Sequence, residues 1–103
     1  MKKIAVFASG GGTDFQSVID ANAKENFCEI KYLVASKPNI GAINRAKKAG
    51  IECLVYDKSQ YSNIAEFYAV LTETFQKDGI ELIVLAGWLL IIPEDFIANF
   101  AFT

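Results

Sequence analysis

The stretch that decides the fold is IAVFASGGGTDFQ, residues 4–16. An apolar run followed by three glycines and then by a helical pattern is typical of a strand, a tight turn and a helix N-terminus. Glycines let the backbone approach a ligand closely, and the unpaired N–H groups at the start of a helix attract anions. The stretch therefore predicts a phosphate-binding turn.

Strand and helix patterns alternate along the rest of the chain. The apolar runs predict strands at residues 4–8, 28–36, 51–56 and 80–86. Helical spacing predicts helices that begin near Asp14, extend over 39–49 and 63–79, and begin at Pro93. Continuous apolar runs such as 82–85 indicate strands that are buried on both faces. Asn63 with Glu66 three residues later fits a capping box, and Gly79 fits the end of that helix.

Alternating strands and helices of this length predict right-handed βαβ units. We therefore expect an α/β fold: a Rossmann-like parallel sheet of about four strands with helices on both faces, forming a single domain over residues 1–103. We expect the strand order 3-2-1-4. The glycine turn and the loop 87–92 then follow neighbouring strands and form opposite walls of one crevice.

Composition excludes several classes of protein. With ten Lys and Arg against twelve Asp and Glu, the net charge is −2, so nucleic acid is not an expected partner. No apolar run reaches the roughly 20 residues of a membrane span, and we expect a cytoplasmic protein. The chain has no histidine and only two cysteines, Cys28 and Cys53, so no metal site is expected.

The glycine turn does not match the two common nucleotide motifs. Gly10 and Gly12 supply the first two positions of a dinucleotide fingerprint, but Phe15 stands where the third glycine belongs. No Gly-Lys-Ser or Gly-Lys-Thr follows, which excludes a Walker loop. What remains is a monophosphate cup that uses the backbone N–H groups of Gly12, Thr13 and Asp14 and the Thr13 hydroxyl. We expect the Asp14 side chain to cap the helix, turned away from the anion. The alternative is a purely structural strand-to-helix turn.

Four stretches in register resemble phosphoribosylglycinamide formyltransferase, the folate-dependent enzyme of purine biosynthesis. The stretch at residues 9–16 resembles its Ser-Gly-x-Gly-Ser/Thr-Asn-hydrophobic-Gln motif. Residues 34–38 resemble its second strand and turn, residues 45–51 its second helix, and residues 85–92 its Leu-Ala-Gly-aromatic loop. The resemblance extends over essentially the whole chain.

The resemblance implies formyl transfer from the co-substrate 10-formyltetrahydrofolate to glycinamide ribonucleotide. Carried over by position, the substrate phosphate is bound by Gly11, Gly12, Thr13 and Asp14. The folate is bound by Leu89, Leu90, Ile91 and Ile92. Two positions depart from the family pattern, because Asp14 replaces an asparagine and Leu90 replaces an Arg or Lys.

The resemblance also implies what these 103 residues lack. In the family, an Asn-x-His-Pro strand and a later aspartate carry the catalysis, and none of these residues is present. The expectation is an N-terminal half, truncated before the catalytic strand, that binds the substrate phosphate and is inactive alone. A sheet interrupted there exposes an edge and apolar surface, so we expect self-association.

Two other classes of function remain open. One is a related folate enzyme, such as formyltetrahydrofolate deformylase or methionyl-tRNA formyltransferase. The other is a non-enzymatic phosphate- or nucleotide-binding module. Among the remaining residues, Cys28 and Cys53 are expected to be buried apolar residues. Trp88 fits either packing beneath the loop or the edge of the folate site.

Overall fold

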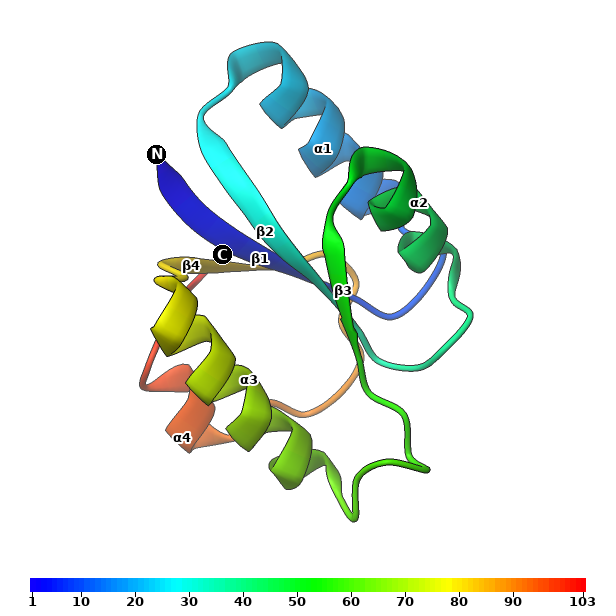
Figure 1. Cartoon of the computed structure of the whole chain (residues 1–103), viewed down its shortest axis with the longest axis vertical. Helices are drawn as coiled ribbons and strands as arrows, with labels where there is room; N and C mark the ends of the chain where they lie inside the picture. Colours follow the sequence, from blue (N-terminus) through cyan, green and yellow to red (C-terminus); the bar gives the residue numbers. More distant parts are fainter.

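The computed structural model describes all 103 residues as one three-layer α/β unit (Figure 1). Its strands are β1 (Lys2–Ala8), β2 (Cys28–Ala35), β3 (Glu52–Val55), β4 (Leu82–Leu85) and β5 (Ala101–Phe102). Its helices are α1 (Thr13–Glu25), α2 (Gly41–Ala49), α3 (Ile64–Asp78) and α4 (Glu94–Ile97). The longest helix, α3, has 15 residues, and no helix is long and apolar enough to span a membrane.

All strand pairs are parallel, in the order β3-β2-β1-β4-β5. The predicted α/β class and the order 3-2-1-4 are confirmed. The predicted count of about four strands is wrong, because β5 adds a fifth strand beyond β4. This strand has only two residues, which are too few to show an alternating or continuous apolar pattern.

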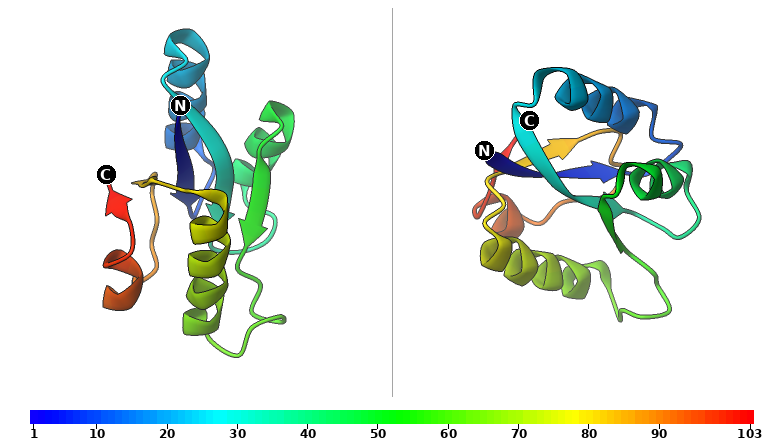
Figure 2. Two further views of the ribbon diagram at one scale, coloured as in Figure 1. Left: turned by 60° about the vertical axis from the view of Figure 1, so that its left-hand side comes forward. Right: turned by 45° about the horizontal axis from the view of Figure 1, so that its top comes forward.

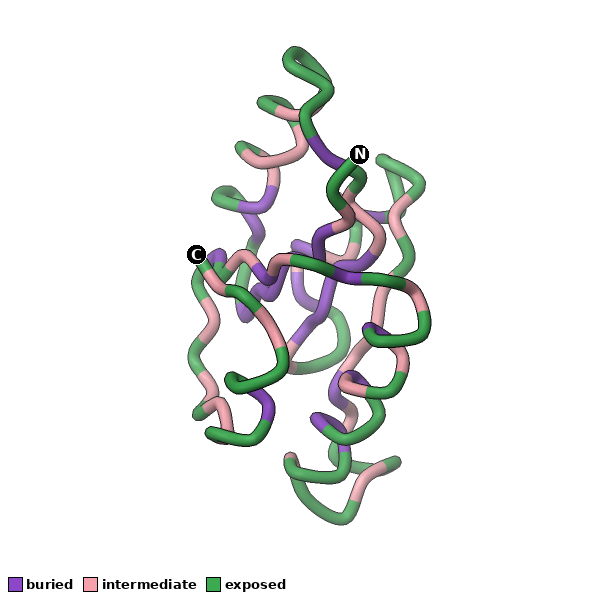
Figure 3. Tube along the Cα trace, turned by 90° about the vertical axis from the view of Figure 1, so that its left-hand side faces the viewer, coloured by how far each residue is buried: buried purple, intermediate pink, exposed green.

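The helices cover the two faces of the sheet in pairs, with α1 and α2 on one face and α3 and α4 on the other (Figure 2). Successive residues of β1 point to opposite faces of the sheet. Phe7 packs among the aromatic residues of α3 and α4, while Val6 packs with Phe15 of α1. Both faces of β1 are therefore buried. Figure 3 shows the buried residues gathered along the central strands.

The predicted helix ends are mostly confirmed. The Asn63 side chain accepts a hydrogen bond from the Glu66 backbone N–H at 3.0 Å, which caps α3. Gly50 and Gly79 end α2 and α3 in the left-handed conformation, with φ of 72° and 73°. Helix α2 begins at Gly41 rather than at residue 39, because Asn39 has a left-handed φ of 64°.

Candidate functional site

The glycine turn joins the end of the central strand β1 to the start of α1. Gly12 is the N-cap residue, with φ 82° and ψ 25°, and its carbonyl accepts from the Gln16 N–H at 2.7 Å. The N–H groups of Gly11 and Gly12 have no acceptor within the protein. The N–H groups of Thr13 and Asp14 lie in the first helical turn, where a helix offers no partner. The turn therefore presents free donors at a positive helix end.

The expected position of Asp14 is wrong. Gly12 is the N-cap and no side chain caps α1, so Asp14 lies inside the first turn of the helix. Its side chain is exposed, beside the free N–H groups. The left-handed φ of Gly12 starts the helix one residue earlier than the sequence pattern indicates. An acid in this turn interacts favourably with the helix dipole, and it competes with any bound anion.

Close packing against α2 fixes the shape of the turn. A Cβ atom on Gly12 would lie 2.7 Å from the Ala42 Cα, and one on Gly41 would lie 2.9 Å from the Gly11 carbonyl oxygen. Both distances are shorter than real Cβ contacts allow. The Ala42 N–H also donates to the Gly10 carbonyl at 3.2 Å. Glycine is therefore required at position 12 for two reasons: its left-handed φ and its close contact with Ala42.

Arg45 is a residue that sequence reasoning did not assign to the site. Its Nε donates to the Gly11 carbonyl at 2.8 Å, and a terminal nitrogen donates to the Gln16 Oε1 at 3.3 Å. A polar hollow of about 300 Å³ lies here beside the turn, lined also by Asn44 and Lys48. The guanidinium thus braces the turn and adds positive charge near it. Arg45 lies in the stretch 45–51 that resembles the family's second helix, but the sequence does not show that this helix contacts the glycine turn.

The loop after β4 is tied directly to the end of β1. The buried Ser9 hydroxyl oxygen accepts from the Leu89 backbone N–H at 3.0 Å. The Ala86 N–H donates to the Phe7 carbonyl at 2.8 Å. The glycine turn and the loop 87–92 therefore start from adjacent points at the same edge of the sheet.

The aliphatic residues 89–92 of this loop divide between two environments. Leu89 and Ile91 are 83% and 86% exposed, whereas Leu90 and Ile92 are half-buried and pack against the aromatic core. An apolar residue at position 90 agrees with this inward direction, because a charge there would be taken out of water. Leu89 and Ile91 are the side chains available to a ligand.

Trp88 packs beneath the loop. Its Nε1 donates to the Tyr68 hydroxyl at 3.0 Å, and its ring meets the Phe7 ring edge-on with centroids 4.9 Å apart. Trp88 thereby anchors the loop to α3 and β1.

The chain offers no activated cysteine at this edge. Burial raises the pKa of both Cys28 and Cys53, so both remain neutral thiols at pH 7. Cys28 is buried and Cys53 half-buried, on neighbouring strands β2 and β3, and both are free. Besides the Asp14 carboxylate, the groups gathered at the edge are backbone donors, cations and apolar side chains, a set suited to binding an anion beside an apolar group.

The family model described as "Formyl transferase" matches residues 2–103. The chain belongs to this formyl transferase family. Among its curated relatives, the phosphoribosylglycinamide formyltransferase of Bacillus subtilis is 34% identical over 98 residues, covering 94% of this chain and 50% of the relative. That of Haemophilus influenzae is 35% identical over 102 residues, covering 98% and 48%.

Solved structures show the same fold. Glycinamide ribonucleotide transformylase 1 from Geobacillus kaustophilus superposes with a TM-score of 0.87 at 28% identity, covering 97% of this chain and 56% of that chain. The phosphoribosylglycinamide formyltransferase of Campylobacter jejuni gives 0.86 at 28% identity, covering 98% and 55%. The chain thus spans about half the length of these four relatives.

Proposed function

We propose that the glycine turn binds the phosphate of glycinamide ribonucleotide, the substrate of a folate-dependent formyl transfer. The observation on which this rests is the set of free N–H groups at residues 11–14, at the N-terminus of α1 and braced by Arg45. Gly11 and Thr13 are exposed and accessible to a ligand, and the Thr13 hydroxyl adds a donor. The names of the relatives supply the identity of the ribonucleotide.

The loop 89–92 is the proposed binding surface for the second substrate, 10-formyltetrahydrofolate. Leu89 and Ile91 offer apolar side chains for the pterin ring, while Leu90 and Ile92 hold the loop on the core. The Ser9–Leu89 hydrogen bond sets this surface beside the phosphate turn. The proposed site therefore needs no metal, because phosphate and folate are held by backbone donors and apolar contact.

Two glycine variants test the phosphate site. A Cβ atom on Gly11 or on Gly10 meets nothing within 4 Å, so both alanine variants retain the fold. Gly11→Ala places a methyl group in the proposed cup, and calorimetry should show glycinamide ribonucleotide bound at least about tenfold more weakly. Gly10→Ala, outside the cup, is the matched control. Equal affinity in the two variants would contradict the phosphate site.

Replacing the acid in the first turn tests the same site in the opposite direction. Asp14→Asn removes a negative charge beside the anion and adds an amide donor, so ribonucleotide binding should tighten by about three- to tenfold. The nucleoside without its phosphate is the control ligand, and its binding should not change. If the variant binds both ligands with the affinity of the parent chain, the proposal that Asp14 lies beside the bound phosphate is overturned.

We further propose that the 103 residues alone bind both substrates weakly and do not transfer the formyl group. No histidine is present to move a proton near neutral pH, and the asparagine and aspartate of the family's catalytic set are not among these residues. The test mixes the purified chain with both substrates and follows formylglycinamide ribonucleotide by mass, with the Bacillus subtilis enzyme as positive control. Formation of product above the buffer blank would refute this proposal.

The proposal includes the setting in which the chain acts. We propose that the chain acts in the cytoplasm. We also propose that it associates with a second copy at the β5 side of the sheet. Outside the proposed folate surface, two of its seven exposed large apolar residues lie in the segment that leads to β5, namely Leu85 at the end of β4 and Ile97 of α4. An apolar groove of about 360 Å³ between α1 and β4 reaches Thr103 on the same side.

A further inference from the structure

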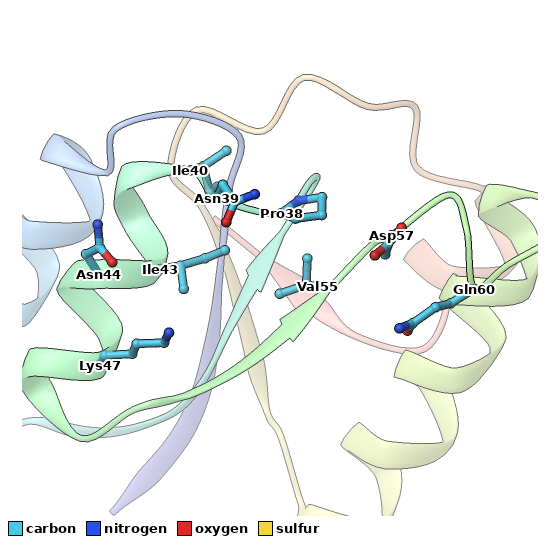
Figure 4. A pocket seen from close by; sticks show the side chains of 9 residues that line it. All are labelled: Pro38, Asn39, Ile40, Ile43, Asn44, Lys47, Val55, Asp57 and Gln60. Atoms are coloured by element: carbon cyan, nitrogen blue, oxygen red, sulfur yellow. The ribbon is translucent and has the colours of Figure 1, made fainter.

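A second cavity, of about 490 Å³, lies between α2 and β3, where β2 and β3 end (Figure 4). Its lining and that of the polar hollow beside Gly11 share only Asn44. In open parallel sheets, ligands bind outside the carboxyl ends of the strands. This cavity also lies outside carboxyl ends, those of β2 and β3, but away from the switch point between β1 and β4, and it contains none of the residues proposed to bind the two substrates.

One side of the cavity is apolar. Ile43 of α2 and Val55 at the end of β3 project into the space between these two elements, and Pro38 lies close to Val55 (Figure 4). Both Ile43 and Val55 are half-buried, so each retains accessible surface. An apolar surface of this kind suits the face of a planar ring.

The rim of the cavity carries three side-chain amides with free hydrogen-bonding capacity. Asn39, Asn44 and Gln60 make no side-chain hydrogen bond to any other group of the protein. Each amide offers both a donor and an acceptor, the combination that pairs with the edge of a nucleobase. They surround the apolar side from the β2–α2 turn, from α2 and from the β3–α3 loop.

The cavity also holds one cation and one carboxylate, on opposite elements. Lys47 of α2 forms no ion pair, since the one salt bridge of the chain joins Lys31 and Glu29. The Asp57 Oδ1 accepts from the Ser59 N–H at 2.9 Å and from its hydroxyl at 2.7 Å. These bonds hold the carboxylate in place and lower its pKa, while Oδ2 accepts no bond within the protein. An anionic group on a ligand would pair with Lys47, and an amino or hydroxyl group would donate to Oδ2.

We propose that this cavity is a separate binding site for a nucleoside 5′-monophosphate. The base lies on Ile43 and Val55 with its edge toward the amides and Asp57, and the ribose extends along α2 so that the phosphate faces Lys47. Each kind of group in the cavity then has a counterpart on the ligand. The site goes beyond the proposed formyl transfer, because it shares no residue with the glycine turn or the loop 89–92.

The experiment titrates the 103-residue chain with adenosine 5′-monophosphate and follows backbone amide signals by NMR. Signals of Asn44, Lys47, Val55 and Asp57 should shift, while Thr13 at the glycine turn should not. Adenosine lacks the phosphate and ribose 5-phosphate lacks the base. Each should bind at least about tenfold more weakly than adenosine 5′-monophosphate.

Two neighbouring lysines give a matched pair of variants. Lys47→Ala should weaken adenosine monophosphate binding by about tenfold and leave adenosine binding unchanged, because only the phosphate partner is lost. Lys48→Ala, which removes an equal charge from the adjacent hollow, should change neither. Three results would each overturn the proposal. They are NMR shifts centred on the glycine turn, an equal loss of nucleotide affinity in both lysine variants, and an affinity for ribose 5-phosphate equal to that for adenosine monophosphate. Loss of ribonucleotide binding in Gly11→Ala does not bear on it, so the two proposals fail separately.

Discussion

At the residue scale, the glycine turn shows which positions the fold constrains. Three glycines stand in a row, yet only Gly12 has both a left-handed φ and a neighbour within 3 Å of where its Cβ would lie. Gly10 and Gly11 have neither restriction. The sequence shows three equivalent residues, and the packing of α2 against the turn makes one of them irreplaceable. Gly11 is then free of any packing constraint, which agrees with its proposed role in contact with the ligand.

Gly12→Ala should lower the free energy of unfolding by at least about 2 kcal/mol, because it combines backbone strain with a clash against Ala42. Gly10→Ala should stay within about 0.5 kcal/mol of the parent chain. Urea unfolding followed by circular dichroism measures both. Two alanine variants of equal stability would show that the close contact at Ala42 does not exist.

Tyr32 gives the fold a dependence on alkaline pH. Its hydroxyl donates to the Asp78 carboxylate, and this bond, together with burial and the negative charges of Asp78 and Glu52, raises the pKa of Tyr32 to about 12. In the unfolded chain the pKa is about 10. The folded state therefore holds this proton more tightly. The stabilisation is complete below pH 10 and is lost as the pH rises toward 12.

The test compares the parent chain with Tyr32→Phe, which keeps the ring and removes the titrating group. The difference in unfolding free energy between the two should be constant below pH 10 and should shrink between pH 10 and 12. Absorbance at 295 nm follows tyrosine ionisation in the same samples. A difference that does not change over this range would contradict the role of the Tyr32–Asp78 bond.

At the scale of elements, prediction from sequence succeeds where a local signal is strong. Helix α3 is an example. Its apolar spacing, the Asn63 cap and Gly79 all predict a helix between residues 63 and 79, and the structure contains this helix with both predicted ends. Strand β5 shows the opposite, because two residues carry no periodicity and are defined only by pairing with β4. The expected Asp14 cap of α1 is wrong, because Gly12 occupies the N-cap position in a left-handed conformation, in close contact with α2.

The cap of α3 can be tested directly. Asn63→Ala removes the acceptor of the Glu66 N–H and should cost about 1 kcal/mol of stability. Ser62→Ala, one residue earlier and also exposed, should change the stability by less than about 0.5 kcal/mol. Both values come from urea unfolding. Equal stability of the two variants would mean that the Asn63 cap does not contribute.

At the scale of the whole molecule, the strand order decides which distant segments meet. The adjacency of β1 and β4 brings the glycine turn and the loop 87–92 to one edge, and this much follows from the alternating pattern and the rule for parallel sheets. The Ser9–Leu89 bond, the Arg45 brace and the division of Leu89–Ile92 between solvent and core do not follow from it. They depend on side-chain contacts between residues up to 80 positions apart, for which a single sequence carries no signal.

The same sheet order leaves the far side of β5 unpaired. The backbone groups of Ala101–Phe102 face β4 on one side only, and α4 beside them carries Ile97, which is 47% exposed. An open strand edge next to apolar side chains favours pairing with a second chain. At tens of micromolar, light scattering should therefore give a mass above the 11.3 kDa of one chain.

A charge placed at this edge should dissociate the assembly. Ile97→Lys adds a cation beside β5 and should bring the mass back to 11.3 kDa, because pairing would bury the charge without a partner. Val70→Lys is the matched control, since Val70 is 44% exposed on α3 and lies outside the β4–β5 segment. It should associate as the parent chain does. If the parent chain is monomeric throughout the range, or if both variants dissociate equally, association through the β5 edge is refuted.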